Sequence, residues 1–258
     1  LDDGWQAASG DWCPDSPSCP EPRGMYPDRF PDDTFTAVRD VLGDDMRLGL
    51  WMTPMHFNPA SEAYRQNPEW ACTPLGDGLA VYNTVEPDSS SNEAGLGTWN
   101  PLAVALPEQQ RLVDHIEGRI ERAIEVYGAR YFKFDFLVWL DCVGRTATDT
   151  IDAYTYREAF VAMLDRLIAR HPGVTFQIDE TNDYRLFPFE SASRGPSWYA
   201  NGSPTVDQAL HNLWVLAPYV PASTIGQSAL GRLRDGYSAD YLMAIALTSH
   251  VTFFNDLT

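Results

Sequence analysis

The spacing of apolar residues along the chain predicts alternating helices and strands. Two long segments, 107–127 and 152–171, carry apolar residues three and four positions apart, which is typical of amphipathic helices packed on a core. Gly128 and the sequence His171-Pro172-Gly173 follow these segments as stop signals. Shorter helices are predicted over four more segments: one beginning near Pro31 with Asp32 and Asp33 in its first turn, and 61–70, 205–219 and 240–249.

Short apolar runs between these helices predict the strands 47–54, 131–136, 175–179, 222–226 and 251–255. Because strands and helices alternate, we expect right-handed βαβ units and a parallel sheet. If Leu1 is the last residue of a truncated first strand, the strand count comes close to eight. We therefore expect residues 1–258 to form one (β/α)8 TIM barrel domain, as a segment of a longer protein. A doubly wound open sheet is the alternative, but no glycine fingerprint follows a first strand.

Three segments lack either period and are expected to be loops. Residues 1–31 are dense in Pro, Gly, Asp and Ser, and residues 180–204 mix polar, aromatic and glycine residues. Residues 73–100, which include a run of serines, are expected to have little regular structure.

Composition narrows the classes of partner. The chain has 36 acidic against 18 basic residues and a formal net charge of −18, which argues against nucleic acid or an anionic membrane as a partner. No apolar run approaches the length of a membrane helix, and the chain does not open like a signal peptide, so it reads as soluble, with the compartment open.

Cysteine and histidine usage gives no support for a metal or a cofactor. Cys13 and Cys19 lie close enough for a local loop disulfide, and their spacing matches no zinc motif. The five histidines form no recognisable ligand cluster, and His115 and His211 fall in predicted helices.

The segment Tyr131–Phe136 places charge inside a run that otherwise has the pattern of a buried strand. Side chains two residues apart in a strand share a face, so Lys133 and Asp135 are expected to stand together. Lys133 is also the only lysine of the sequence. A structural ion pair is one interpretation of the two residues. A functional site is the other, and we favour it.

Further polar and aromatic residues fall where barrel enzymes carry their active groups, at the carboxyl ends of strands. Asp2 and Asp3 follow the truncated first strand, Trp51 ends the second, and Asp179 and Glu180 close a later one. Carboxylates together with flat rings suit the binding of a carbohydrate, because carboxylates bind hydroxyls and rings pack on sugar faces. Four of the eight tryptophans fall at or near this predicted rim: Trp5, Trp12, Trp51 and Trp198.

Taken in order, several short motifs resemble those of the melibiase family, the α-galactosidase and raffinose-synthase branch of the retaining glycoside hydrolases. The match extends over almost the whole chain. The motifs are Leu1-Asp2-Asp3-Gly4-Trp5, Gly10-Asp11-Trp12, Gly49-Leu50-Trp51, Asn58-Pro59-Ala60-Ser61, Asn67-Pro68-Glu69-Trp70 and Lys133-Phe134-Asp135, with Pro221–Gly226 and the segment from Ser249 to Leu257 resembling the late strands.

This resemblance implies a role for each matched residue. Asp135 would be the nucleophile that forms a covalent glycosyl-enzyme, and Lys133 would bind sugar hydroxyls beside it. A neighbouring cation also favours the charged carboxylate that a nucleophile needs. Asp2 and Asp3 would hold hydroxyls at the far edge of the ring, and Trp51 would line the pocket.

The sequence departs from the family pattern in three places. Thr53-Pro54-Met55 replaces the usual Glu-Pro-Glu, and residues 180–185 replace a glycine-rich segment, which leaves Asn182 as the candidate sugar contact there, with Trp198 further on. The position expected for the acid/base, near residues 201–202, carries no carboxylate. The possible replacements, in order of preference, are Glu190, Asp207 and Asp183. Glu190 follows an apolar run that would favour a proton donor, whereas Asp207 looks like a helix cap.

These observations and the resemblance favour a retaining glycoside hydrolase acting on α-linked sugars. The resemblance implies an α-galactoside as the default substrate, and the departures around Thr53, Met55 and Asn182 leave a different sugar open. Two alternatives remain open. One is a catalytically degenerate relative that binds carbohydrate without cleaving it, and the other is a transglycosylase of the same family. A second carboxyl about 5 to 5.5 Å from that of Asp135 would favour hydrolysis.

Overall fold

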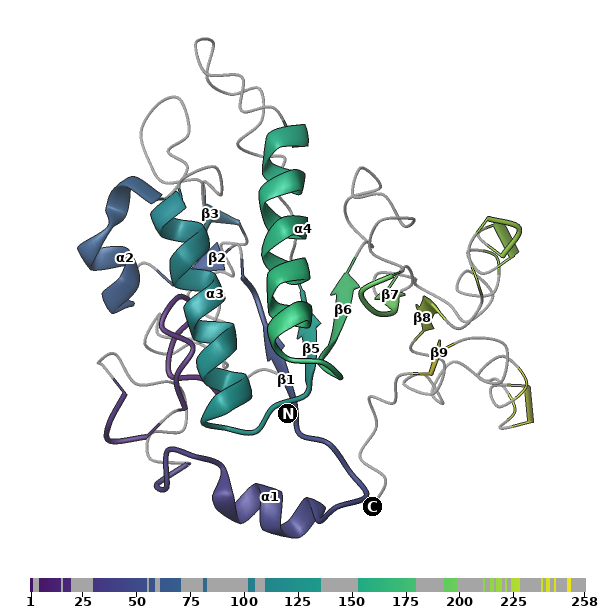
Figure 1. The fold of residues 1–258 in the computed structure, drawn as a ribbon, viewed down its shortest axis with the longest axis horizontal. Helices are drawn as coiled ribbons and strands as arrows, with labels where there is room; N and C mark the ends of the chain where they lie inside the picture. Colours follow the sequence, from purple (N-terminus) through teal and green to yellow (C-terminus); the bar gives the residue numbers. More distant parts are fainter. Residues whose placement is uncertain are drawn as a thin grey trace. The chain divides into compact units, whose positions relative to one another are not determined.

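A computed structural model describes about half of the chain, in two compact units, Leu1–Thr175 and Phe176–Thr258 (Figure 1). The described residues are 1, 5–14, 16–19, 30–54, 56–58, 61–70, 81–82, 102–104, 110–135, 153–179, 193–198, 211, 214–215, 217–219, 221, 224–227, 238, 240–241, 244 and 250–251.

The first unit is built on two parallel strands, β1 (Gly49–Met52) and β5 (Tyr131–Phe134), paired in register from Gly49 with Tyr131 onward. The other edge of β1 bonds to Leu1, whose amino group donates to the Gly49 carbonyl at 2.6 Å and whose carbonyl accepts from the Trp51 amide at 2.9 Å. Bonds to residues on either side of Leu50 are the pattern of a parallel ladder. Leu1 thus lies beside β1 as a parallel neighbour, although no strand is assigned at this residue.

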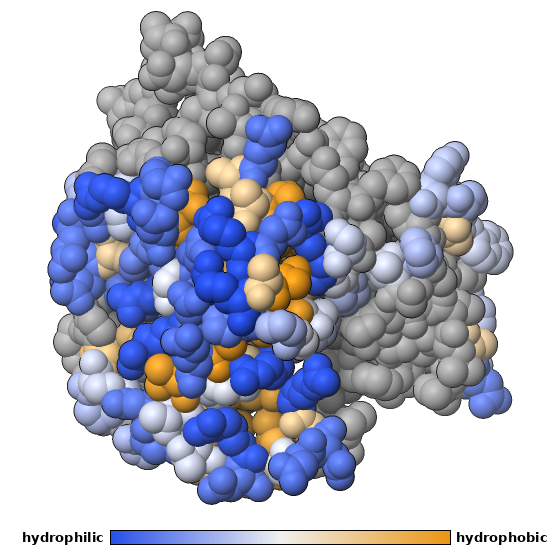
Figure 2. Space-filling view, viewed as in Figure 1, coloured by the Kyte–Doolittle hydropathy of each residue, from blue (hydrophilic) through white to orange (hydrophobic). Residues whose placement is uncertain are grey.

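Two long helices of this unit, α3 (Gln110–Glu125) and α4 (Ala153–Arg170), lie side by side (Figure 1). Both match the predicted segments. The apolar stripe of α3 is buried as its spacing predicts, and so are Phe160, Leu164 and Leu167 of α4. The buried apolar residues of α3 are Leu112, Val113, Ile116, Ile120, Ala123 and Ile124. On the face seen in Figure 2 the coloured residues are mostly hydrophilic, with apolar residues between them.

The first helix begins later than predicted: α1 spans Thr36–Leu42, whereas the prediction placed its start near Pro31. Phe35 stops it on the amino-terminal side, since its backbone is left-handed with φ of 56°. Asp32 accepts hydrogen bonds from the amides of Phe35 and Ala37, and these bonds lower its pKa. Asp32 therefore organises a capping turn. Phe35 is fully buried, while Val41 is 83% exposed, so the predicted apolar face is not buried as a unit.

The predicted segment 61–70 forms α2 (Glu62–Gln66) and the 3-10 turn η1 (Pro68–Trp70). Ser61 caps α2 by accepting from the Tyr64 amide at 3.1 Å. A second cap comes from the distant Asp11, whose two carboxylate oxygens accept from the Glu62 and Ala63 amides at 3.0 and 2.9 Å. The motif that contains Asp11 thus ties the amino-terminal loop to α2.

Gly10 makes that connection possible. Its φ is 103°, and a Cβ atom there would collide with the ring of Phe57. The His115 ring packs near Trp12 and Phe57, and its Nε2–H donates to the Gly10 carbonyl at 2.7 Å. Burial lowers the pKa of His115. This histidine is a half-buried residue whose ring is hydrogen-bonded within the protein, which agrees with a structural role.

Cys13 and Cys19 form a disulfide, which confirms the predicted local bridge. Within the same loop the Ala7 amide donates to the Cys13 carbonyl at 3.0 Å, and Ser16 donates to the carboxylate of Asp33. The amino-terminal segment is therefore irregular but tightly bonded.

A small antiparallel sheet was not predicted. It joins β2 (His56–Phe57), β4 (Leu102–Val104) and β3 (Val81–Tyr82) in that order. Strand β3 is the described part of the segment 73–100, and its two residues are consistent with the expectation of little regular structure there. Two-residue strands carry too few positions to reveal a period of two.

In the second unit β6 (Thr175–Asp179), β7 (Ser197–Trp198), β8 (Ile225–Gln227) and β9 (His250–Val251) pair in parallel and in that order. β6 matches its prediction, and β8 and β9 fall beside theirs. β7 was missed, and Trp198 therefore lies in a strand and not in a loop. The Gly195 position, two residues before β7, leaves no room for a Cβ atom against the Phe176 carbonyl.

Parallel strands pair in both units, and the first unit combines them with helices, which confirms the prediction of an α/β fold with a parallel sheet. A closed barrel is not seen within the described part of the chain. None of its helices is long and apolar enough to cross a membrane.

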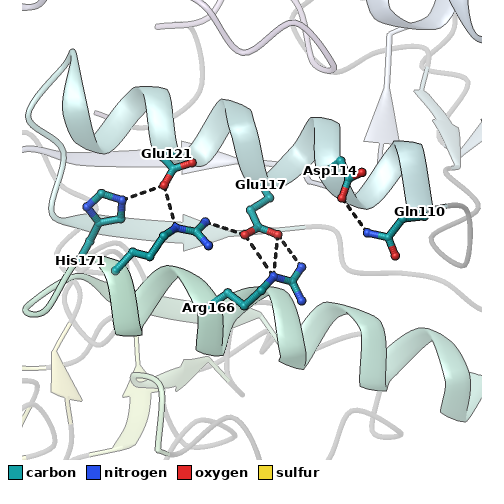
Figure 3. Close-up of polar contacts among 7 residues, drawn as sticks. Gln110, Asp114, Glu117, Glu121, Arg166 and His171 are labelled. Carbon is teal, nitrogen blue, oxygen red and sulfur yellow. Dashed lines mark hydrogen bonds and ion pairs between the residues drawn. The ribbon is translucent and has the colours of Figure 1, made fainter.

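An ion-pair network holds α3 to α4 (Figure 3). The carboxylate of Glu117, 12% exposed, accepts from Arg166 and Arg170, each at 2.5 Å, and Arg170 also donates to Glu121 at 2.8 Å. Burial alone would raise the pKa of Glu117, but the hydrogen bonds from the two arginines outweigh it and leave that pKa below its usual value. A charge placed in an otherwise apolar helix face is thus satisfied by the neighbouring helix.

We expect Glu117→Gln to lower the free energy of unfolding at pH 7 by roughly 2 kcal/mol. This is less than the ~3–5 kcal/mol for breaking a fully buried pair, because the two arginine side chains are 44% and 41% exposed. A lowered carboxyl pKa stabilises the fold above about pH 4.5, and that contribution disappears as the pH falls through the folded-state pKa. Chemical denaturation at pH 7 and pH 3.5 should therefore show the difference shrinking in acid. The exposed Glu125→Gln on the same helix is the control, and equal losses in both variants would refute the network's role.

Asp11→Ala should destabilise the first unit by about 2 kcal/mol, because it leaves two amides at the start of α2 without their acceptor. Asp11 is 1% exposed, so water cannot readily replace it. Ser61→Ala, which removes one bond, should cost about 1 kcal/mol. Thermal unfolding checks both against Asp40→Ala in the exposed part of α1. A loss for Asp11→Ala no larger than that of Asp40→Ala would show that the distant cap is unimportant.

Candidate active site

The pairing of β1 with β5 brings three predicted site residues together. Trp51 is the register partner of Lys133, and Asp135 follows two residues later on the same face. The amide of Asp135 donates to the Met52 carbonyl at 2.9 Å, which extends the ladder to the carboxyl end of β5. The alternate residues Phe132 and Phe134 are fully buried on the opposite face, where Phe134 meets Phe160 of α4. Alternation in β5 thus separates the core from the charged pair.

The contacts among these residues converge on one oxygen. The indole Nε1–H of Trp51 donates to Asp135 Oδ2 at 2.9 Å, and Lys133 Nζ lies 3.7 Å from the same atom. The side chains of Lys133 and Asp135 are only 12% and 9% exposed. A carboxylate so enclosed requires compensation, and an N–H donor with an ammonium group provides it by stabilising negative charge on Oδ2. The predicted juxtaposition of Lys133 and Asp135 is therefore confirmed.

The amino-terminal loop is hydrogen-bonded to the end of β1 and to Thr53, which follows it. The indole of Trp5 donates to the Trp51 carbonyl at 2.7 Å, and Thr53 Oγ1 donates to Ser9 Oγ at 3.0 Å. Trp5 and Trp12 are each 1% exposed, so the expectation that they offer rings at an open rim is wrong. They pack instead among core aromatic residues. Loop composition alone cannot distinguish a solvent-facing tryptophan from one folded back onto a strand.

Thr53, which replaces the first glutamate of the family pattern, is fully buried. Its hydroxyl bonds to Ser9 and so closes the amino-terminal loop over the carboxyl end of β1. The hydroxyl of Thr53, hydrogen-bonded within the protein, thus stands where the family pattern has a glutamate carboxylate. Met55, the other changed position of that motif, lies outside the described residues.

Several predicted site residues cannot be placed relative to Asp135. The candidates Asp2, Asp3, Asn182, Glu190 and Asp207 lie outside the described residues, and so does Asp183. For Trp198 only the backbone position in β7 is described. What the sequence analysis missed is the bond from Trp51 to Asp135. The signal for it was the register of two neighbouring strands, which the βαβ rule suggests but does not fix.

One group within the described residues has the composition of a metal site. Glu121, Glu125 and His171 offer ligand atoms within 4.8 Å of one another. However, Glu121 Oε1 already accepts from Arg170 at 2.8 Å and contacts His171 Nε2 at 3.1 Å (Figure 3). The guanidinium group repels a cation from this oxygen. We therefore assign Glu121 and His171 to the ion-pair network between α3 and α4.

The chain is similar to curated α-galactosidases. It is 36% identical over 195 residues to "Probable alpha-galactosidase C" of Aspergillus terreus, covering 69% of the chain and 22% of that protein. It is 33% identical over 196 residues to "Alpha-galactosidase C" of Emericella nidulans, with the same coverage, and 31% identical over 244 residues to "Probable alpha-galactosidase G" of that organism, covering 88% of the chain and 29% of the relative. The chain thus spans between a fifth and a third of the length of these relatives. No protein-family model matches it.

Solved structures share its fold. The α-galactosidase of Lactobacillus brevis superposes with a TM-score of 0.70 at 18% identity, covering 100% of the chain and 33% of that structure. A variant of the Geobacillus stearothermophilus α-galactosidase in complex with raffinose gives 0.66 at 17% identity, covering 100% and 34%. With the curated relatives, these likenesses identify the chain as a distant member of the melibiase-like α-galactosidase family of glycoside hydrolases.

Proposed function

We propose that the chain contributes the nucleophile of a retaining α-galactosidase, and that this nucleophile is Asp135. The observation that carries the proposal is the enclosed Asp135 carboxylate at the end of β5, bonded to Trp51 and paired with Lys133. Family membership supports the same assignment, since Lys133 and Asp135 match the family motif. Relatives of the same fold are described in complex with raffinose and with p-nitrophenyl α-D-galactopyranoside, which makes an α-galactoside the substrate we propose.

The proposed reaction has two displacements. In the first, a carboxylate oxygen of Asp135 attacks the anomeric carbon while the bond from that carbon to the leaving oxygen breaks, and an acid protonates the leaving oxygen. In the second, water attacks the same carbon, gives its proton to the base and releases Asp135 as a carboxylate. Two inversions give net retention. Lys133 would contribute positive charge beside the attacking carboxylate and bind a sugar hydroxyl.

The remaining roles rest on the family pattern. We propose that the parallel strands close into a (β/α)8 barrel, that residues 1–258 are one catalytic domain, and that Asp2 and Asp3 bind hydroxyls at the far edge of the sugar. Glu190 is our first candidate for the acid/base and Asp207 the second, with Asp183 third. The ring of Trp51 is 3% exposed, so any edge it offers the sugar is narrow.

One feature of the sequence favours a second candidate function. No carboxylate stands near residues 201–202, where the family pattern places the acid/base. A chain with a nucleophile but no acid would bind an α-galactoside and cleave it poorly, which is the degenerate carbohydrate-binding alternative. A transglycosylase would differ by passing the sugar to a hydroxyl of another sugar in place of water.

Asp135→Ala should lower kcat/KM for p-nitrophenyl α-D-galactopyranoside by at least ~10³-fold in the full natural polypeptide, because the covalent intermediate can no longer form. Added azide should restore turnover and yield the β-galactosyl azide, since a small anion can occupy the space of the lost carboxylate. Product analysis by NMR identifies the azide and, for the wild type, retention at the anomeric carbon.

The matched control is Asp44→Ala, which removes an exposed carboxylate of the same unit and should leave activity unchanged. Wild-type turnover that persists in Asp135→Ala would exclude Asp135 as the nucleophile. An inactive wild type that still binds galactosides would instead establish the binding-only alternative. Galactosyl transfer to added sugar that exceeds hydrolysis would establish the transglycosylase.

Glu190→Gln should slow galactosides with poor leaving groups by ~10²–10⁴-fold and affect p-nitrophenyl galactoside far less in its first step, because a good leaving group needs little protonation. Asp207→Asn and Asp183→Asn, measured with the same substrate pair, compare the three candidates directly. The acid/base is the residue whose substitution lowers the rate more for the poor leaving group than for the good one. Rates equal to those of the wild type for all three variants, with both substrates, would exclude all three candidates.

A further inference from the structure

We propose that Trp51 is a positioning residue for Asp135, acting through its indole N–H on the carboxylate. The inference rests on the proposed function, in which Asp135 is the nucleophile, and adds a role that differs from lining the sugar pocket. It starts from the bond of 2.9 Å between Trp51 Nε1 and Asp135 Oδ2.

A carboxylate that must attack an anomeric carbon has two orientational variables, its side-chain direction and the rotation of the carboxyl group. The backbone N–H of Asp135 donates a hydrogen bond to the Met52 carbonyl at 2.9 Å, which holds the backbone and leaves those two side-chain rotations to be fixed. The terminal rotation of an aspartate is intrinsically broad. A bond to one named oxygen restricts both rotations at once.

Lys133 is less suited to this task. Its Nζ lies 3.7 Å from Oδ2, beyond the ~2.7–2.9 Å of a charge-assisted hydrogen bond, so that contact supplies attraction with little direction. A lysine ammonium also sits on a flexible four-carbon chain. The indole N–H, in contrast, is fixed to a rigid ring at hydrogen-bond distance. Charge and direction are thus divided between two neighbours of one oxygen.

Trp51 is itself held on several sides. Its amide donates to the Leu1 carbonyl at 2.9 Å, and its carbonyl accepts from the Trp5 indole at 2.7 Å. Its side chain is buried, and its strand position is fixed by pairing with β5. The donor therefore belongs to a part of the unit that cannot easily shift. Positioning of this kind affects rate strongly, because a displacement of about 1 Å of a reacting group can cost ~10²-fold.

The experiment compares Trp51→Phe with Trp12→Phe in the full natural polypeptide. Both replace a buried indole by a phenyl ring, but the indole nitrogen of Trp12 has no hydrogen-bond partner among the described residues. We expect Trp51→Phe to lower kcat for p-nitrophenyl α-D-galactopyranoside by ~10–100-fold and to change KM by less than about threefold. Trp12→Phe should leave kcat and KM near the wild-type values, even if it lowers the melting temperature as much as Trp51→Phe does. A kcat loss as large in Trp12→Phe, or none in Trp51→Phe, overturns the inference.

A second measurement does not depend on catalysis. The sequence has eight tryptophans, so ¹⁵N-tryptophan labelling gives a small set of indole N–H signals in NMR spectra. Trp51→Phe or, if that variant does not fold, Trp51→His assigns the Trp51 signal by its disappearance. Asp135→Ala, which removes the acceptor, should then shift that signal strongly upfield while the Trp12 signal stays in place. An unmoved Trp51 signal would show that the bond is absent in solution and would overturn the inference.

The two measurements separate the two proposals. A wild type that turns over no galactoside while the Trp51 signal responds to Asp135→Ala contradicts the proposed function and supports the contact. An active wild type whose kcat is unchanged in Trp51→Phe supports the proposed function and contradicts the positioning role.

Discussion

A carboxylate enclosed at the end of a parallel strand is the constraint on which the first unit depends. Asp135 cannot be left without compensation there, and its neighbours are arranged to supply it: an N–H from β1 and an ammonium group from its own strand. Both reach Oδ2 only because β1 and β5 pair with Trp51 opposite Lys133. A shift of one residue in that register would turn one of the strands over and separate the three groups.

The described residues of the amino-terminal loop support the end of β1, although their regular structure is limited to an isolated bridge between Gln6 and Pro14. Trp5 bonds to the carbonyl of Trp51, Ser9 accepts from Thr53, and Asp11 caps α2. The disulfide between Cys13 and Cys19 closes the same segment on itself. The buried side chains of Ser9 and Asp11 find partners on elements far away in sequence, which is what burying polar groups of an irregular segment requires, whereas Gln6 Oε1 and Trp12 Nε1 have no partner among the described residues. A site residue and its support therefore come from different parts of the chain.

Sequence reasoning succeeded where a single period extends over many residues. The stripes of α3 and α4 gave both helices nearly to their ends, and the alternation in β5 gave the shared face of Lys133 and Asp135. It failed where one side chain decides the local structure, as when Asp32 caps a turn and Phe35 becomes left-handed ahead of α1. It failed also for β3 and β7, which are two residues long and owe their existence to neighbouring strands. The bond from Trp51 to Asp135 belongs to this last class, since strand register is a property of the fold.

The division of labour around Asp135 bears on how far the site can depart from its family and still work. An ion pair alone would keep the carboxylate charged, and that would serve sugar binding as well as cleavage. A directional donor matters chiefly for attack at one carbon atom, because binding tolerates rotations that displacement does not. After β1 the chain has Thr53 at a position where the family pattern has a glutamate. Two residues earlier it has the tryptophan of the family pattern, Trp51, whose indole N–H donates a hydrogen bond to Asp135. Retention of direction as well as charge is what a site used for covalent chemistry requires, and it favours the enzyme over the binding module.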